Sequence, residues 1–147
     1  MNTIMAFDYG SKRIGVAIGQ QLTATTRSLD TVAVRQNKPD WDHISRLLKE
    51  WQPDLLLIGL PLTEDGGEQE MSIAARRFAN RLNGRYQLPV ELVDERYSSM
   101  EAEELAINAR RNGRLKKAKV KQAVDQIAAE LIIQTWLAEN SAANNQP

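Results

Sequence analysis

The chain contains no cysteine and a single histidine, His43, among its 147 residues. The absence of cysteine excludes both a disulfide framework and a thiolate metal site. One histidine excludes a zinc site built from several histidines of the same chain. Basic and acidic residues both number 19, so no net charge draws in nucleic acid or a membrane surface. A nucleic-acid partner would therefore have to be held by a local patch.

The sequence also has no apolar run of membrane-spanning length, and it does not begin with the basic start and long apolar stretch of a signal peptide. These features predict a cytoplasmic protein that has no membrane partner. With 42% hydrophobic and 26% charged residues, the composition is that of a globular protein. The length suits one domain, which we expect to span residues 1–138, followed by a disordered tail at 139–147.

The first third of the chain predicts an antiparallel sheet. Thr3–Phe7 and Ile14–Ile18 are apolar rows joined by a tight turn at Gly10 and Ser11, and a third strand is expected at Thr31–Val34. The second row carries Gly15 and Gly19, positions at which another backbone can approach closely.

The rest of the chain alternates between helices and strands. Apolar spacing predicts a helix from Trp41 to Trp51, with its tryptophans in the core and His43 exposed, and Leu55–Ile58 is apolar on both faces, as in a central parallel strand. A helix near residues 70–82, a strand at Pro89–Val93 and further helices starting at Ser98 and at Val120 follow. The order predicts an α/β fold, a mixed five-stranded sheet of three antiparallel strands followed by parallel strands, flanked by helices.

Three carboxylates are placed to meet at one end of this sheet. Asp8 follows the first strand, Glu95 follows the fifth strand, and Asp125 lies at the border of the apolar stripe of the last helix. The small residues Ala128 and Ala129 would let that helix approach the sheet. Asp94 competes with Glu95, because adjacent strand residues face opposite ways. The alternative for any one of these carboxylates is a cap or an ion pair, such as an i, i+4 pair of Lys121 with Asp125.

Carboxylates that converge without histidine or cysteine favour Mg²⁺ or Mn²⁺ over zinc. Two such ions can activate a water and stabilise the leaving oxygen in phosphodiester cleavage. Asp8, Glu95 and Asp125 are therefore the candidate metal-binding and catalytic residues.

A basic segment leads directly into the helix that carries Asp125. It predicts a contact with a phosphate backbone, although a run of this kind is more often a solvated face. Lys12 and Arg13 would extend it as a basic rim. Together with those two residues, the candidate nucleic-acid contacts are Arg114, Lys116, Lys117, Lys119 and Lys121.

Four motifs stand in the order of one known family. They are Asp8-Tyr9-Gly10-Ser11-Lys12-Arg13-Ile14-Gly15-Val16-Ala17, Gly59-Leu60-Pro61-Leu62 with Asp65-Gly66, Asp94-Glu95-Arg96-Tyr97-Ser98, and Lys121 through Asp125 to Ala128-Ala129. From residue 3 to about 137 the chain resembles the YqgF/RuvX family of Holliday junction resolvase-like proteins and pre-16S rRNA nucleases.

The resemblance implies a ribonuclease H-like fold, metal-dependent nuclease chemistry and maturation of the 5′ end of small-subunit ribosomal RNA. Carried over by position, Asp8, Glu95 and Asp125 form the acidic site of the family. Many ribonuclease H-like nucleases use four carboxylates and three are matched here, so the number of metal ions stays open. Tyr97 also departs from the smaller aliphatic residue that is common at its position.

Other functions compete with an RNA nuclease. A Holliday junction resolvase would act on branched DNA, and it would use a symmetric dimer to cut two strands, whereas an RNA nuclease can be a monomer or a homodimer. A factor associated with RNA or transcription would keep the fold without catalysis, and the ribosome is an expected partner. Asp8-Tyr9-Gly10-Ser11 also resembles the first phosphate loop of sugar and acetate kinases, which makes an actin-like ATPase lobe a more distant alternative.

Overall fold

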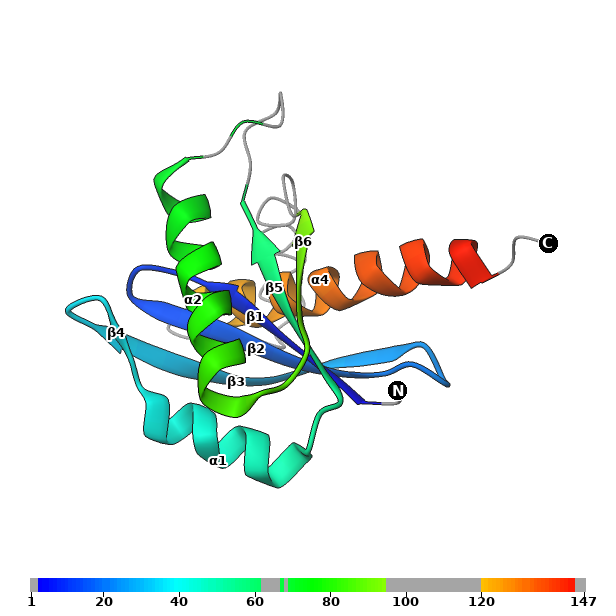
Figure 1. The fold of residues 1–147 in the computed structure, drawn as a ribbon, viewed down its shortest axis with the longest axis horizontal. Coiled ribbons are helices and arrows are strands. Elements are labelled where there is room, and N and C mark those ends of the chain that lie inside the picture. The colour runs from blue at the N-terminus through cyan, green and yellow to red at the C-terminus, as the bar shows by residue number, and fades with distance from the viewer. Residues whose placement is uncertain (1–2, 62–66, 68, 95–119, 145–147) are drawn as a thin grey trace.

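The structure is a computed structural model that describes residues 3–61, 67, 69–94 and 120–144. Its centre is a six-stranded sheet in the order β4-β3-β2-β1-β5-β6 (Figure 1). The elements are β1 (Thr3–Tyr9), β2 (Arg13–Gln20), β3 (Thr25–Arg35), β4 (Lys38–Pro39), α1 (Trp41–Trp51), β5 (Leu55–Leu60), α2 (Glu70–Tyr86), β6 (Val90–Asp94) and α4 (Val120–Asn144).

The strand directions confirm the predicted mixed sheet. β1, β2 and β3 pair antiparallel, β5 pairs parallel to β1, and β6 pairs parallel to β5. The sheet has one strand more than the five predicted, because Lys38–Pro39 forms a two-residue strand against the end of β3. β5 continues two residues beyond the predicted Leu55–Ile58, through Gly59 and Leu60.

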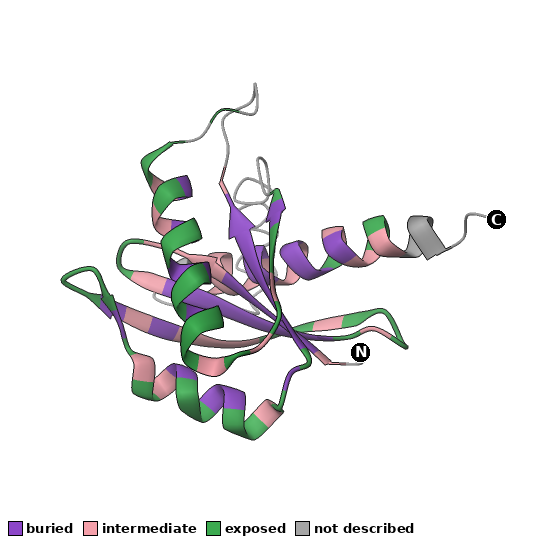
Figure 2. Cartoon of the chain, viewed as in Figure 1, coloured by how far each residue is buried: buried purple, intermediate pink, exposed green. Residues whose placement is uncertain are grey.

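Each face of the sheet carries its own apolar core, because successive side chains of a strand point to opposite faces. Met5 and Phe7 of β1 pack against α1 and α2, whereas Ile4 and Ala6 pack against α4. Figure 2 shows the buried inner strands between these layers. The alternation therefore tells which face each later residue of β1 occupies.

Helix α4 is fixed to β3 by a row of polar contacts, which we call the polar ladder. The Gln126 amide donates to the Thr31 hydroxyl at 2.8 Å. Glu130 accepts from the hydroxyls of Thr26 and Ser28 at 3.1 and 2.9 Å. Gln134 donates to Thr26 at 3.1 Å. Since the three α4 residues are spaced by four, they lie along one side of the helix.

The observed helices match the predicted ones at some ends and exceed them at others. α1 has the predicted bounds, and its cap residue Asp40 accepts from the backbone N–H of His43 at 3.2 Å. α2 continues to Tyr86, beyond the predicted end near residue 82, and α4 continues to Asn144, into the segment 139–147 that was expected to be a disordered tail. The helix predicted to start at Ser98 lies outside the described residues. Within the described part of the chain, no helix is both long and apolar enough to cross a membrane.

Candidate metal centre

Asp8 lies on the face of the sheet that α4 covers. Its neighbours two and four residues earlier, Ala6 and Ile4, belong to the α4-side core, and Asp8 pairs directly with Gly15 of β2. The side chain is half-buried near the end of β1. Directly paired residues of antiparallel strands project to the same face of the sheet. The Asp8 side chain therefore lies beside the position that a side chain of Gly15 would occupy.

Because Gly15 has no side chain, α4 packs directly against β2 at this position. A Cβ placed on Gly15 would overlap the backbone carbonyl of Asp125 and would lie 2.8 Å from the Cβ of Asp125. Only a residue without a side chain permits this approach. Asp8 and Asp125, which are far apart in the sequence, therefore both border Gly15 on one face of the sheet.

The small residues expected to allow this packing are in place. Ala128 and Ala129 are buried, at 1% and 0% exposure. Gly19, the second glycine of β2, faces Ile133 of α4, whose Cγ2 atom would lie 2.8 Å from a Cβ on Gly19. The predicted close approach of another backbone is confirmed at Gly15, whereas at Gly19 the nearest group is the Ile133 side chain.

Arg13 is the cation beside Asp125. Its Nε donates to Asp125 Oδ2, and the two side chains are 33% and 21% exposed. Burial raises the pKa of Asp125 above its ordinary value of 3.8, and the hydrogen bond and charge of Arg13 oppose that rise without cancelling it. Arg13, predicted as a nucleic-acid contact, thus lies against a candidate metal ligand. The side chain of Lys121, the partner considered for Asp125, is outside the described residues.

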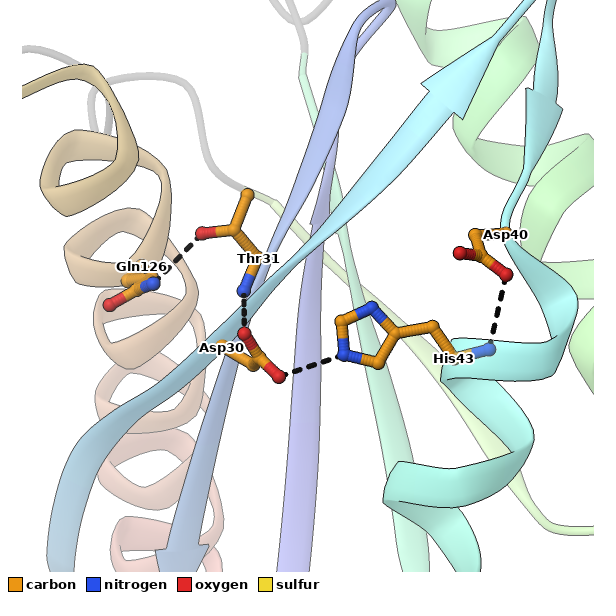
Figure 3. A network of polar contacts seen from close by, with 5 residues as sticks. All are labelled: Asp30, Thr31, Asp40, His43 and Gln126. Atoms are coloured by element: carbon orange, nitrogen blue, oxygen red, sulfur yellow. Dashed lines mark hydrogen bonds and ion pairs between the residues drawn. The ribbon is translucent and has the colours of Figure 1, made fainter. Parts of the chain in front are cut away.

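A chain of hydrogen bonds fixes the turn of α4 that follows Asp125 (Figure 3). Gln126 donates to Thr31, which is the register partner of Gly15 on β3. The backbone N–H of Thr31 donates to Asp30 at 2.8 Å, and His43 Nε2 of α1 donates to the other Asp30 oxygen at 2.8 Å. The prediction that His43 is exposed is wrong. Its side chain, which contacts Asp30, is only 22% exposed.

Asp94 does not share the face of Asp8 and Asp125. It ends β6 and is exposed, and the preceding residue, Val93, packs in the α4-side core. Alternation along the strand therefore directs Asp94 to the opposite face. The described residues contain no group of three or more histidine, cysteine, aspartate or glutamate side chains placed to hold a metal ion. What they bring together is one pair of carboxylates.

Of the predicted basic rim, the structure also places Lys12. It is exposed in the turn between β1 and β2, at the end of the sheet where Asp8 lies. The residues that lie outside the described part of the chain are Glu95, Arg114, Lys116, Lys117 and Lys119. Glu95 and the basic segment therefore stay predictions.

Curated relatives match nearly the whole chain. A protein of Saccharophagus degradans is 46% identical over 134 residues, which cover 91% of this chain and 92% of the relative. A protein of Aeromonas salmonicida is 49% identical over 137 residues, covering 93% of this chain and 95% of the relative. Both carry the name "Putative pre-16S rRNA nuclease".

Solved structures with little sequence similarity share the fold. The Thermus thermophilus RuvC, solved in complex with a Holliday junction substrate, superposes with a TM-score of 0.54 at 15% identity and covers 96% of both chains. The fowlpox virus resolvase, solved in complex with Holliday junction DNA, gives a TM-score of 0.55 at 14% identity and covers 94% of this chain and 98% of its own. These similarities confirm the expected ribonuclease H-like fold of RuvC-type resolvases.

The profile of one protein family spans the region that contains these features. It is RuvX, described as "Holliday junction resolvase", and it matches residues 2–139. The match includes both aspartates at Gly15 and the segments that carry Glu95 and the basic residues. Together with relatives above 45% identity, it shows that the chain belongs to the RuvX family.

Proposed function

We propose that this protein is a metal-dependent nuclease that cleaves phosphodiester bonds in the precursor of 16S ribosomal RNA, at its 5′ end. The observation that carries the proposal is the convergence of Asp8 and Asp125 at Gly15, on one face of the sheet and at one end of it. Carboxylates brought to one place from distant parts of a chain are typical ligands of a shared divalent cation.

The residues at this place fit a divalent cation. Carboxylate oxygens are the ligands that Mg²⁺ and Mn²⁺ prefer. The raised pKa of Asp125 shows that Arg13 alone does not offset the burial of that carboxylate, so further positive charge would stabilise it. Nucleases of the RuvC and RuvX type generally use divalent metals, and we propose Mg²⁺ or Mn²⁺ here.

Asp8 and Asp125 would hold the metal, and Glu95 is the proposed third ligand. The position of Asp94 on the opposite face removes the competitor of Glu95. A metal bound by these carboxylates supplies an activated water and stabilises the leaving oxygen. Arg13 donates to Oδ2 of Asp125, so Oδ1 is the oxygen that would hold the metal. The number of ions depends on whether a fourth carboxylate joins the site.

The substrate is a nucleic acid held by a basic rim. Lys12 is exposed beside the site, and the segment with Arg114, Lys116, Lys117, Lys119 and Lys121 precedes Asp125 in the sequence. The names of the curated relatives favour a ribosomal RNA precursor, which would place the protein in the cytoplasm, in contact with ribosome assembly. An RNA end can be processed by a monomer.

Branched DNA is the second candidate substrate. It is favoured by the description of the family and by the resolvases of similar fold that were solved with junction DNA. In that case a homodimer would be required, because a junction presents two strands for symmetric cleavage.

The deciding experiment incubates the purified protein with 16S rRNA precursor and with four-way DNA junctions, each in EDTA and in Mn²⁺. We expect cleavage of the precursor in Mn²⁺ and none by Asp8→Asn, which should still bind RNA. Cleavage of junctions alone would select the DNA substrate. Undiminished cleavage by Asp8→Asn would exclude the proposed site, and stabilisation by ATP with Mg²⁺ but not by Mn²⁺ would favour an ATPase lobe.

A further inference from the structure

A cavity of about 500 Å³ lies on the face of the sheet opposite to the metal centre. Its lining residues come from α2 between Glu70 and Arg81, from the end of β1 and the turn after it, and from the region of the β3–β4 connection. These elements are labelled in Figure 1. The residues that carry its chemistry are Tyr9, Ser11, Asn37, Met71, Arg77 and Arg81. A volume of this size is typical of a pocket for a small molecule or for one unit of a polymer.

Two exposed arginines line this pocket without a carboxylate partner. Arg77 and Arg81 lie one turn apart on α2, and within the described part of the chain neither forms an ion pair. Arg85 continues the same row, but its guanidinium lies 4.1 Å from the centre of the Trp41 ring. Glu70, which also lines the pocket, is two helical turns from Arg77, or about 10 Å along the axis. The arginine end of the pocket therefore suits an anion.

The rest of the lining includes aromatic and apolar side chains. Tyr9 is half-buried, and its ring centre lies 4.9 Å from that of Phe78, which is buried. Tyr9 is thus held in place by Phe78 while it lines the cavity. Met71 and Ile73 add apolar surface, and Ile73 is 55% exposed. The Tyr9 ring, fixed in place beside Arg77 and Arg81, favours a ligand that carries both a flat base and a phosphate.

The pocket lies directly behind the metal centre. Asp8 and Tyr9 are consecutive residues of β1, so their side chains point to opposite faces at the same end of the strand. The turn that joins β1 to β2 lies between the two sites and contributes Ser11 to the pocket and the exposed Lys12 to the rim. A single strand that passes over this turn can reach both sites.

We propose that this pocket binds one unpaired nucleotide of the substrate strand that passes over the β1–β2 turn to the bond cleaved at Asp8 and Asp125. Its base lies against Tyr9, and its phosphate is held by Arg77 and Arg81. The proposal rests on the proposed nuclease function. It makes the protein selective for a junction between paired and unpaired nucleic acid, because a nucleotide in a duplex cannot enter the cavity.

The test compares two RNA probes in EDTA, where no cleavage occurs. One is a short blunt duplex, and the other is the same duplex with unpaired nucleotides at both ends. Fluorescence anisotropy gives the affinity of each. We expect the wild-type protein to prefer the probe with unpaired ends, and the double variant Arg77→Gln, Arg81→Gln to reduce that preference about tenfold, a size in the range of one stacked base and its phosphate.

A matched control removes the same charge elsewhere. Arg46 and Lys49 are exposed on α1, outside the pocket. The double variant Arg46→Gln, Lys49→Gln should keep the preference for unpaired ends. If the pocket variant weakens both probes equally, the arginines belong to a general electrostatic surface and the proposal is wrong. If it weakens neither, the proposal is also wrong, and a protein partner becomes the better occupant.

Tyr9 provides a second readout that separates stacking from charge. Tyr9→Leu should lose the preference without changing the dependence of affinity on salt, whereas Tyr9→Phe, which keeps the ring, should retain it. A Tyr9→Phe variant that loses the preference would contradict stacking. Asp8→Asn should keep the preference and lose cleavage. If it cleaves normally, the proposed function fails while the binding result for the pocket is unaffected.

Discussion

Gly15 of β2 and Asp125 of α4 touch backbone to backbone, so that no side chain fits between them. Because Asp8 pairs with Gly15, this one contact sets how close the two candidate metal ligands come. The contact is open to direct tests.

Gly15→Ala should lower stability by about 1–3 kcal/mol, the usual cost of overpacking, and should abolish cleavage by moving Asp125. Gly19→Ala should cost less, because the nearest atom belongs to the Ile133 side chain and the nearest backbone atom, the Thr25 oxygen, is 3.2 Å away. Gly84→Ala on α2 meets nothing within 4 Å and should raise stability by about 0.5–1 kcal/mol. Thermal unfolding ranks the three variants, and an undisturbed Gly15→Ala protein would refute the close contact.

Asp8→Asn should leave the metal-free melting temperature unchanged or raise it, because carboxylates gathered for a metal repel one another when the metal is absent. The same variant should lose most of the stabilisation by Mn²⁺, which for the wild type reaches about 2.7 kcal/mol at a hundredfold excess over Kd. The measurement is thermal unfolding of both proteins in EDTA and in Mn²⁺. A variant that is less stable in EDTA but has a full Mn²⁺ response would make Asp8 a structural residue.

The raised pKa of Asp125 predicts a pH dependence of the metal-free protein. The folded state holds the proton of this carboxyl more tightly than the unfolded state, so its contribution to stability is present below pH 3.8 and is lost as pH rises through the higher folded pKa. The wild type should therefore lose stability relative to Asp125→Asn as pH rises above 3.8, and denaturant unfolding across that range measures the difference. The opposite slope would mean that the Arg13 pair outweighs burial.

Arg13→Gln sharpens the same test. Since Arg13 lowers the pKa of Asp125, its removal should raise that pKa further and extend the loss of stability to higher pH. The effect should vanish in the double variant Arg13→Gln, Asp125→Asn. A pH profile that does not change in Arg13→Gln would show that the ion pair is absent in solution.

Replacement of Lys116, Lys117 and Lys119 by glutamine should weaken the binding of all RNA sequences alike. If each lysine contacts one phosphate, the slope of log K against log salt should fall by roughly 2–3. The α1 double variant Arg46→Gln, Lys49→Gln serves as the control and should leave the slope unchanged. An unchanged slope in the triple variant would make the segment a solvated face.

The sequence predicts this fold where local pattern decides it. The bounds of α1 follow from apolar spacing between Asp40 and Pro53, and the burial of β5 follows from its unbroken apolar run. β3 is longer than predicted because its first half, from Thr25 to Leu29, is mostly exposed or half-exposed and has no apolar periodicity to reveal it.

The site is predictable in part for the same reason. Gly15 indicates a close backbone approach on β2, and Ala128 and Ala129 indicate that α4 can approach the sheet and bring Asp125 near the strand ends. The partner of Asp125 could not be found in this way, because Arg13 lies 112 residues away and no local spacing links the two. The hydrogen bond between Asp30 and His43 likewise has no local sequence signal, because it joins strand β3 to helix α1.

The polar ladder between α4 and β3 limits which changes of chain length this protein can tolerate. Gln126, Glu130 and Gln134 meet Thr31, Ser28 and Thr26 in one register only. One added or deleted residue between Gln126 and Gln134 would rotate part of the helix by about 100° and leave ladder groups without partners. Among RuvX proteins, differences in length should therefore fall in the connections between elements, while this stretch of α4 changes by substitution alone.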